Sequence, residues 1–262
     1  MDAAARESRA LARWKPPTGS LTDRSLAALV IGLSRTIMRR MNSLTIEGAE
    51  RFESQLERGD RGLLTFSNHV SLFDDPLLLS NLRLPPYRRL RWVASDALNF
   101  FGSPWKSFIF NAGKCVPIVR GRGFDQPGFD FLVARLREGE WVHIFPEGGR
   151  TRDPGAMLSG PFKAGIGRLI VESEPFLLPF YHHGMREVLP VGSRLPRLRK
   201  RVRMVFGQEV DGRSIVGALR RRGGPELSGP ALWDAVTQRT YELLTGLESE
   251  VRPSAAIRQV AA

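Results

Sequence analysis

The sequence predicts an α/β fold in which helices flank a mixed, mainly parallel β-sheet, an αβ-sandwich. Short apolar runs alternate along the chain with longer segments of helical periodicity, which is the pattern of successive strand–helix–strand units. The 262 residues are 42% hydrophobic and 25% charged, values typical of a folded protein, and their number suits one domain with a substantial core. We find no internal repeat.

In chain order, residues 1–42 are expected to form an N-terminal arm followed by a membrane-associated amphipathic helix. Residues 1–19 are polar and end in Pro and Gly, so we expect a loose arm. Residues 20–41 begin with a Ser/Thr/Asp capping signal and place apolar residues at helical spacing before a basic end. Such a helix fits two interpretations. It is either packed on the core or lies in the membrane interface with its arginines at the lipid headgroups.

Residues 43–215 are expected to form the catalytic domain. Strands are predicted at 44–47, 63–67, 90–95, 115–119, 141–145, 176–181 and 202–206, and helices at 49–58, 76–82, 97–111, 129–138 and 162–173. The segment 97–111 holds four Phe and a Trp around a Gly-Ser-Pro break, which fits either a core helix or an apolar surface that enters lipid or receives an acyl chain. Residues 216–262 are expected to form a loop, a helix at 231–250 and a frayed tail that pack on the same domain.

The charge balance points to an anionic partner, either nucleic acid or a membrane surface with acidic lipids. The formal net charge is +12, and residues 186–222 hold eleven Arg and Lys against three acidic residues. The longest stretch without a charged residue, 62–73, is far shorter than the roughly 20 residues of a membrane-spanning helix. With no secretory signal in sight, we expect peripheral association with the cytoplasmic face of the cell's inner membrane. Arginine far exceeds lysine, which is typical of a GC-rich bacterial genome.

The stretch SNHVSLFDDP at 67–76 is the candidate catalytic centre. An apolar run precedes it, so His69 is expected at the end of a buried strand, with a turn and then the start of a helix following. A carboxylate that accepts one ring N–H of a neutral imidazole leaves the other nitrogen free to take a proton. The pair His69 and Asp74 is therefore a candidate general base and its orienting carboxylate.

Other predicted strands also end in residues suited to hold a phosphate. Arg120 and Arg150 are planar cations, and Gly121 and Gly148 allow the backbone to approach a ligand closely. Glu147 is expected either to accept from a substrate hydroxyl or to anchor one of these arginines. The candidate substrate-binding residues are Asn68, Arg120, Gly121, Glu147, Gly148 and Arg150.

Three sequence blocks occur in a characteristic order, NHVSLFDDP, GKCVPIVRG at 113–121 and WVHIFPEGGR at 141–150. On these blocks the chain resembles the glycerolipid acyltransferases, which include the bacterial 1-acylglycerol-3-phosphate acyltransferases. It is most similar to the tafazzins within them, because FKAGIGRLI at 162–170 and HHGMREVLP at 182–190 are tafazzin-like as well. The resemblance covers roughly residues 45–210.

The resemblance implies that His69 is the general base, that Asp74 orients it, and that Arg120, Glu147 and Gly148 bind the phosphate-bearing acceptor. The implied reaction moves a fatty acyl group to a free hydroxyl of a lysophospholipid, with no cofactor because the acyl donor is itself a substrate. The donor stays open. Tafazzins take the acyl group from another phospholipid, whereas the Gly-Arg-Thr-Arg at 149–152 is closer to enzymes that acylate lysophosphatidate from acyl-CoA or acyl-carrier protein.

Two other classes of function are weaker. A metal hydrolase would use His69, Asp74, Asp75 and the pair at 182–183, but no zinc-site spacing is present and Cys115 is the only cysteine. A nucleic-acid-binding module would explain the charge, but the sequence holds no helix-turn-helix, zinc-finger or RNA-binding signature. We therefore expect no metal site and no nucleic-acid partner, and leave the oligomeric state open.

Overall fold

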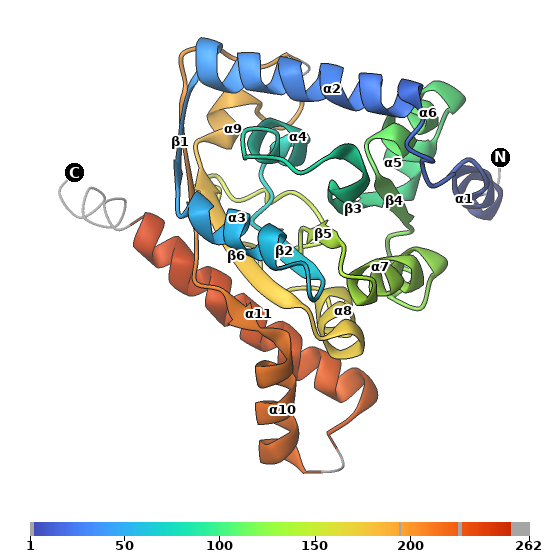
Figure 1. Cartoon of the computed structure of the whole chain (residues 1–262), viewed down its shortest axis with the longest axis vertical. Helices are drawn as coiled ribbons and strands as arrows, with labels where there is room; N and C mark the ends of the chain where they lie inside the picture. Colours follow the sequence, from blue (N-terminus) through green and yellow to red (C-terminus); the bar gives the residue numbers. More distant parts are fainter. Residues whose placement is uncertain (1–2, 194, 225–226, 253–262) are drawn as a thin grey trace.

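An eight-stranded β-sheet runs through the computed structural model of the chain, which describes residues 3–193, 195–224 and 227–252 (Figure 1). The strands are β1 (Ser43–Glu47), β2 (Leu63–Ser67), β3 (Trp92–Asp96), β4 (Cys115–Ile118), β5 (Trp141–Ile144), β6 (Phe176–His183), β7 (Arg201–Phe206) and β8 (Val210–Asp211). Their order is β1-β7-β6-β2-β5-β3-β4, with β8 paired to β6. Neighbours on this path are parallel except β6 and β7, and β8 is antiparallel to β6, which confirms the predicted mixed, mainly parallel sheet.

Helices cover both faces of the sheet. They are α1 (Ala3–Ala12), α2 (Leu21–Arg35), η1 (Thr36–Met41), α3 (Ala49–Arg58), α4 (Asp74–Leu79), η2 (Tyr87–Arg89), α5 (Ala97–Phe101), α6 (Pro104–Ala112), α7 (Pro127–Arg137), α8 (Gly165–Ser173), α9 (Met185–Val188), α10 (Gly212–Gly223) and α11 (Gly229–Val251). Strand β2 shows the layering: Leu64 belongs to the buried cluster shared with α7, α8 and α11, and Leu63 to the cluster shared with α3, α4 and α9. Every residue of β2 is buried and most of them are apolar, as expected for a strand covered on both faces, which is why this run was recognisable in the sequence.

The predicted strands begin and end within two residues of the observed β1 to β7, and the two-residue β8, which follows the strand expected to be the last, is not predicted. The predicted helix after Pro76 instead begins at Asp74 and ends at Leu79, and the predicted 97–111 segment is two helices separated at Gly102 and Ser103. Helix α10 is not predicted by the sequence analysis, because its C-terminal run of arginines hides a short apolar face around Ile215 and Val216. The predicted tail after residue 252 lies outside the described residues.

The prediction of a loose arm at residues 1–19 is wrong, because α1 and the segment after it pack on the domain. Ala10 in α1 is fully buried. Trp14 donates from its indole Nε1 to the carbonyl of Cys115 at 3.0 Å, and its ring meets that of Phe131 edge-on at 5.0 Å. Arg13 adds hydrogen bonds to the carbonyls of Phe101 and Gly102, and a mostly polar composition does not reveal such anchors.

Helix α2 begins as expected and then packs in an unexpected place. Ser20 and Asp23 form a reciprocal capping box at its N-terminus. The helix lies across α4 and α6 rather than on the sheet (Figure 1), and of its residues only Ala27 and Ser34 are buried. Leu29 and Leu33 remain 67% and 60% exposed. Most of the apolar surface of α2 is therefore not used by the core.

Candidate functional site

The register of the sheet brings the predicted site residues to one edge. Strands β2 and β5 are parallel neighbours in which Phe66 lies beside Ile144. The residues that follow each strand, including His69 after β2 and Glu147 after β5, therefore lie at the same edge. This is the position at which sites form in α/β sheets.

His69 and Asp74 form the expected pair. His69 Nδ1 lies 3.0 Å from Asp74 Oδ2, and the same oxygen accepts the backbone N–H groups of Val70 at 2.7 Å and Ser71 at 2.8 Å. Burial by itself would raise the pKa of Asp74, but His182, His69 and the Ser71 amide hold it below its usual value. Asp74 is thus ionised and accepts the Nδ1 proton, so His69 Nε2 carries the free lone pair.

The imidazole of His69 is held on several sides. Its ring stacks on Phe145 with the centroids 4.0 Å apart and an interplanar angle of 18°. Its backbone N–H donates to Glu147 Oε1 at 2.7 Å, and its carbonyl accepts the N–H of Thr151 at 2.8 Å. With 13% of its side chain exposed, His69 is nearly enclosed yet reachable from a cavity.

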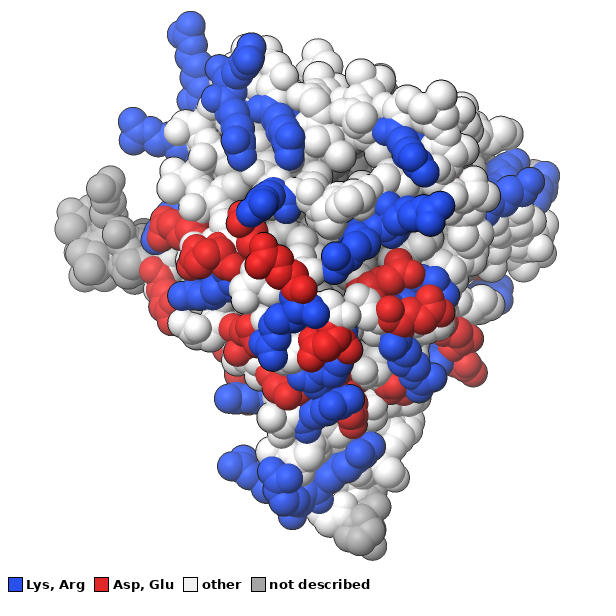
Figure 2. All heavy atoms as spheres, viewed as in Figure 1, with Lys and Arg blue, Asp and Glu red and all other residues white. Residues whose placement is uncertain are grey.

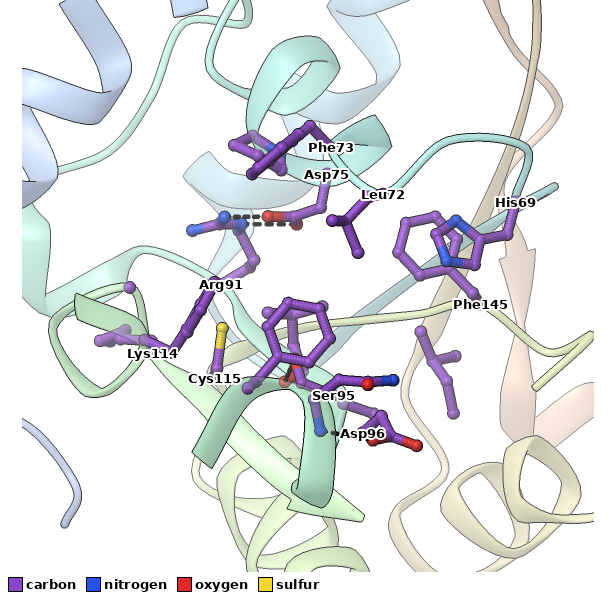
Figure 3. A pocket seen from close by; sticks show the side chains of 18 of the residues that line it. His69, Leu72, Phe73, Asp75, Arg91, Ser95, Asp96, Lys114, Cys115 and Phe145 are labelled. Atoms are coloured by element: carbon purple, nitrogen blue, oxygen red, sulfur yellow. Dashed lines mark hydrogen bonds and ion pairs between the residues drawn. The ribbon is translucent and has the colours of Figure 1, made fainter. Parts of the chain in front are cut away.

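That cavity has a volume of about 1180 Å³, and its lining combines this edge of the sheet with residues of the helices α2, α4 and α6. Figure 3 shows part of the lining, with His69 beside Phe145. Its walls are mainly apolar, with Val30 and Ile31 from α2 and Ile109 and Phe110 from α6. Trp105 and Phe108 of α6 are 63% and 55% exposed on the outside. The segment 97–111 is therefore part core and part surface, because Phe101 is fully buried whereas Trp105 both lines the cavity and is exposed; entry into lipid or binding of an acyl chain stays a prediction.

The predicted residues divide into two layers. The cavity is lined by His69, Arg120, Gly121, Gly148 and Arg150. Asn68, Asp74 and Glu147 are buried behind this lining and are not part of it.

Arg120 is 56% exposed and pairs with Asp96 at 2.9 Å. Its guanidinium lies at the rim of the cavity close to Gly149, where an added Cβ would be 3.9 Å from it. Asp96 also accepts the N–H of Asn99 at the start of α5. The pair thus fixes where the guanidinium lies along the rim.

The buried layer holds the backbone in place. Asn68 exchanges two hydrogen bonds with the backbone of His182, both at 2.9 Å, which fastens the end of β2 to β6. Both oxygens of Glu147 accept backbone N–H groups, from His69 and from Ser159 at 2.8 Å. Burial raises the pKa of Glu147 to about 7. In this structure Asn68 and Glu147 support the site from behind.

Several residues near the cavity were not predicted from the sequence. Lys163 lines it beside Gly148, where a Cβ would lie 2.8 Å from Lys163 Cγ, so a side chain at 148 would collide with the lysine. The carboxylate of Asp75 binds the buried guanidinium of Arg91 through two hydrogen bonds in the cavity wall (Figure 3). The only hints in the sequence are the tafazzin-like string around Lys163 and the doubled aspartate.

The remaining histidines have other partners. His143 Nδ1 lies 3.0 Å from the Thr65 hydroxyl, and burial lowers the pKa of His143 to about 4. His182 Nε2 lies 3.0 Å from the carbonyl of Asn68, and burial keeps its pKa low as well. Among the described residues, no group of three or more His, Cys, Asp and Glu side chains is placed to hold a metal ion.

Comparison with known proteins places this architecture in a family. The family profile described as acyltransferase matches residues 43–183. The chain is 31% identical to tafazzin of Drosophila melanogaster over 83% of its own length and 58% of the fly protein, and 35% identical to the Dictyostelium discoideum protein named taffazin over 60% and 58%. It thus spans 58% of the length of these two relatives.

Two further relatives have names of a different kind. The N-acylphosphatidylethanolamine synthase of Arabidopsis thaliana is 30% identical over 74% of this chain and 72% of the plant protein. The crystal structure of the 1-acyl-sn-glycerophosphate (LPA) acyltransferase PlsC from Thermotoga maritima superposes with a TM-score of 0.55 at 18% identity, over 87% of this chain and 79% of that one. The latter shows a shared fold. On the profile match and on the identity to its relatives, the chain belongs to the acyltransferase family, and within it is tafazzin-like.

Proposed function

We propose that this protein is a phospholipid acyltransferase that moves a fatty acyl group to a free hydroxyl of a lysophospholipid, with His69 as the general base. One observation carries the proposal. His69, oriented by Asp74, lines a cavity that combines long apolar walls with a rim of cations. A fatty acyl chain and a phosphate need these two surfaces on either side of a base.

The reaction follows from the free lone pair on His69 Nε2. A glycerol hydroxyl gives its proton to Nε2 while its oxygen forms a bond to the acyl carbonyl carbon. The resulting tetrahedral centre then breaks its bond to the donor, and the proton passes from His69 to the departing oxygen or sulfur. General-base catalysis of this kind contributes roughly 10²–10⁴-fold. In this scheme Asp74 stabilises the transient imidazolium, and no covalent enzyme intermediate forms.

The phosphate of the acceptor is proposed to bind at the cationic rim. The cavity lining includes the cations Arg120, Arg150 and Lys163, and the side chain of Lys163 lies against Gly148. Gly121 and Gly148 have φ of +82° and +71°, so both hold a left-handed backbone that favours glycine. The backbone at these two turns is free of side chains where a phosphate would approach.

We propose a phospholipid as the acyl donor. The tafazzin-like strings and the two tafazzin relatives support it, and both substrates could then enter laterally from one membrane. The second candidate is an acyl thioester donor, favoured by Arg150 and Arg152 in the segment after Glu147. Either donor presents an acyl carbonyl to the same activated hydroxyl.

The proposed membrane contact is peripheral and on the cytoplasmic face of the inner membrane. Within the described residues no helix is both long and apolar enough to cross a bilayer. Exposed apolar side chains of α2 and α6 flank the cavity, and Lys and Arg gather around this end of the visible face, above a band rich in Asp and Glu (Figure 2). Apolar side chains beside cations are what an anionic bilayer surface binds.

We predict that His69→Ala and Asp74→Asn each lower kcat for acyl transfer by about 10²-fold or more, since one removes the base and the other its orienting charge. His183→Ala is the matched control, because His183 is exposed and does not line the cavity. Acyl transfer is measured with labelled lysophospholipid under saturating donor. Near-normal turnover by His69→Ala would exclude the proposed mechanism.

Arg120→Ala is expected to raise KM for the lysophospholipid by about tenfold and to change kcat little. A charge-assisted hydrogen bond to phosphate, worth about 1.5–3 kcal/mol, is made in the ground state and the transition state alike. Arg122→Ala is the control: Arg122 is similarly exposed, pairs with Glu7 at 2.7 Å and is not in the cavity lining. Equal KM values for the two variants would remove Arg120 from the acceptor site.

The donor is identified by supplying labelled lysophospholipid with either diacyl phospholipid free of CoA or acyl-CoA alone. We expect labelled diacyl product from the phospholipid alone, together with an equal amount of new lysolipid from the donor. Product only with acyl-CoA would replace the phospholipid donor by the thioester. A product acylated on the amine of phosphatidylethanolamine would instead show that the acceptor is that amine, as in the name of the plant synthase above.

Leu21→Ser combined with Leu29→Ser is expected to lower binding to vesicles containing phosphatidylglycerol by at least tenfold, because both side chains are exposed on α2 and neither lines the cavity. Burial of each leucine in lipid is worth about 1.5–3 kcal/mol. Val30 and Leu33 are left unchanged because both line the cavity. The control is Arg220→Ser with Arg221→Ser in α10, which lies at the far end of the molecule from α2 (Figure 1). Undiminished co-sedimentation of the leucine variant would return α2 to the role of an ordinary packed helix.

A further inference from the structure

The segment 145–164, which joins β5 to α8, contains no helix or strand although the structure describes every one of its residues. It carries Glu147, Gly148 and Arg150 of the candidate site. A long connection without regular structure takes its shape from side-chain contacts rather than from a backbone ladder. The position of the site therefore depends on what holds this segment.

The first part of the segment forms hydrogen bonds to His69 directly. Glu147 Oε1 accepts the N–H of His69 at 2.7 Å, and the N–H of Thr151 donates to the His69 carbonyl at 2.8 Å. Both backbone hydrogen-bonding groups of the catalytic residue thus go to this one segment. A shift of the segment would carry His69 with it.

A later part of the segment, at Leu158, is held by the C-terminal helix α11. Glu248 of α11 is only 5% exposed, and its Oε1 accepts the N–H of Leu158 at 3.1 Å and the hydroxyl of Tyr181 at 2.7 Å. The next residue, Ser159, donates its N–H to Glu147 Oε2 at 2.8 Å. A continuous series of contacts therefore runs from β6 and α11 through Leu158 and Ser159 to Glu147 and His69.

Two arginines reinforce the same segment. Arg252, one turn after Glu248, lies 3.7 Å from its Oε1 and donates to the carbonyl of Gly155 and the sulfur of Met157. Arg186 after β6 donates to the carbonyl of Asp153. Every one of these anchors lies outside the cavity lining, so none of them touches a bound substrate.

We propose that Glu248 is a positioning residue for the acyltransferase reaction. It fixes the segment 145–164 against β6 and α11, and through Glu147 it holds His69 at the distance from the substrate that proton transfer requires. The inference rests on the proposed function. It adds to it a residue that lies 101 positions from Glu147 in the chain and contacts neither substrate. Misplacement of a catalytic group by about 1 Å can cost about 10²-fold in rate.

The test compares Glu248→Ala and Glu248→Gln with Glu250→Ala, a control at an exposed position on the same helix. In Glu248→Ala we expect kcat to fall by about tenfold to hundredfold. Glu248→Gln should stay within about twofold of the wild type, because its amide oxygen can still accept from Leu158 and Tyr181. Thermal unfolding of each variant shows that the chain remains folded.

A second readout does not depend on activity. Amide hydrogen exchange should become faster in Glu248→Ala at residues 155–160 and at His69, and should be unchanged there in Glu250→Ala. Tyr181→Phe removes one of the two bonds to Glu248 and should give a smaller increase at the same amides, which preserves the test if the alanine variant does not fold. Exchange that rises only within α11, or full activity in Glu248→Ala, would overturn the proposal.

The two proposals fail separately. A wild-type protein without acyl-transfer activity would refute the proposed function, while faster exchange at the His69 amide in Glu248→Ala would still support the link from Glu248 to His69. Conversely, an active wild type whose Glu248→Ala variant keeps both its turnover and its exchange pattern would refute the role of Glu248 alone.

Discussion

The candidate site depends on one buried oxygen atom, Oδ2 of Asp74. It accepts three hydrogen bonds, from His69 Nδ1 and from the amides of Val70 and Ser71, and His182 Nε2 lies 3.7 Å away. A carboxylate that is 1% exposed would ordinarily be driven toward its neutral form, and these donors keep it ionised. Removing that charge would leave several buried donors unpaired at once, so the turn after β2, the tautomer of His69 and the start of α4 share a single electrostatic cause.

Around Asp74, the residues that hold His69 and the backbone in place are different from the residues that lie at the cavity surface. Hydrogen bonds to the backbone and to His69 are made by Asn68, Asp74 and Glu147. The cavity surface instead holds Arg120 and Arg150. The parallel sheet makes this possible, because β2, β4 and β5 all end at the same edge and deliver both layers there. Chemistry that needs a fixed base and a mobile, charged substrate is well served by such a division.

Local pattern predicted much of the fold and the first layer of the site. The strands were recognisable because a run such as residues 63–67 is mostly apolar and is followed by turn residues, and His69 and Asp74 are only five residues apart in the sequence. The supporting contacts were not recognisable for the opposite reason. Asn68 meets His182 across 114 positions, and Glu147 meets His69 across 78, and no local periodicity encodes such pairs. The packing of the N-terminal segment was not predicted for the same reason, since Trp14 contacts Cys115 only in the folded chain.

Helix α2 links the cavity to the surface that the proposed function places on the membrane. Val30, Ile31 and Leu33 line the cavity, while Leu21 and Leu29 are exposed and are not part of its lining. A helix that packs on α4 and α6 but covers none of the sheet is held by fewer buried contacts than the core helices. Helix α2 therefore forms one part of the wall between the outside and the cavity that contains His69. The proposed path of an acyl chain from the bilayer to the base runs past the apolar side chains of α2 and α6 to His69 and the cationic rim.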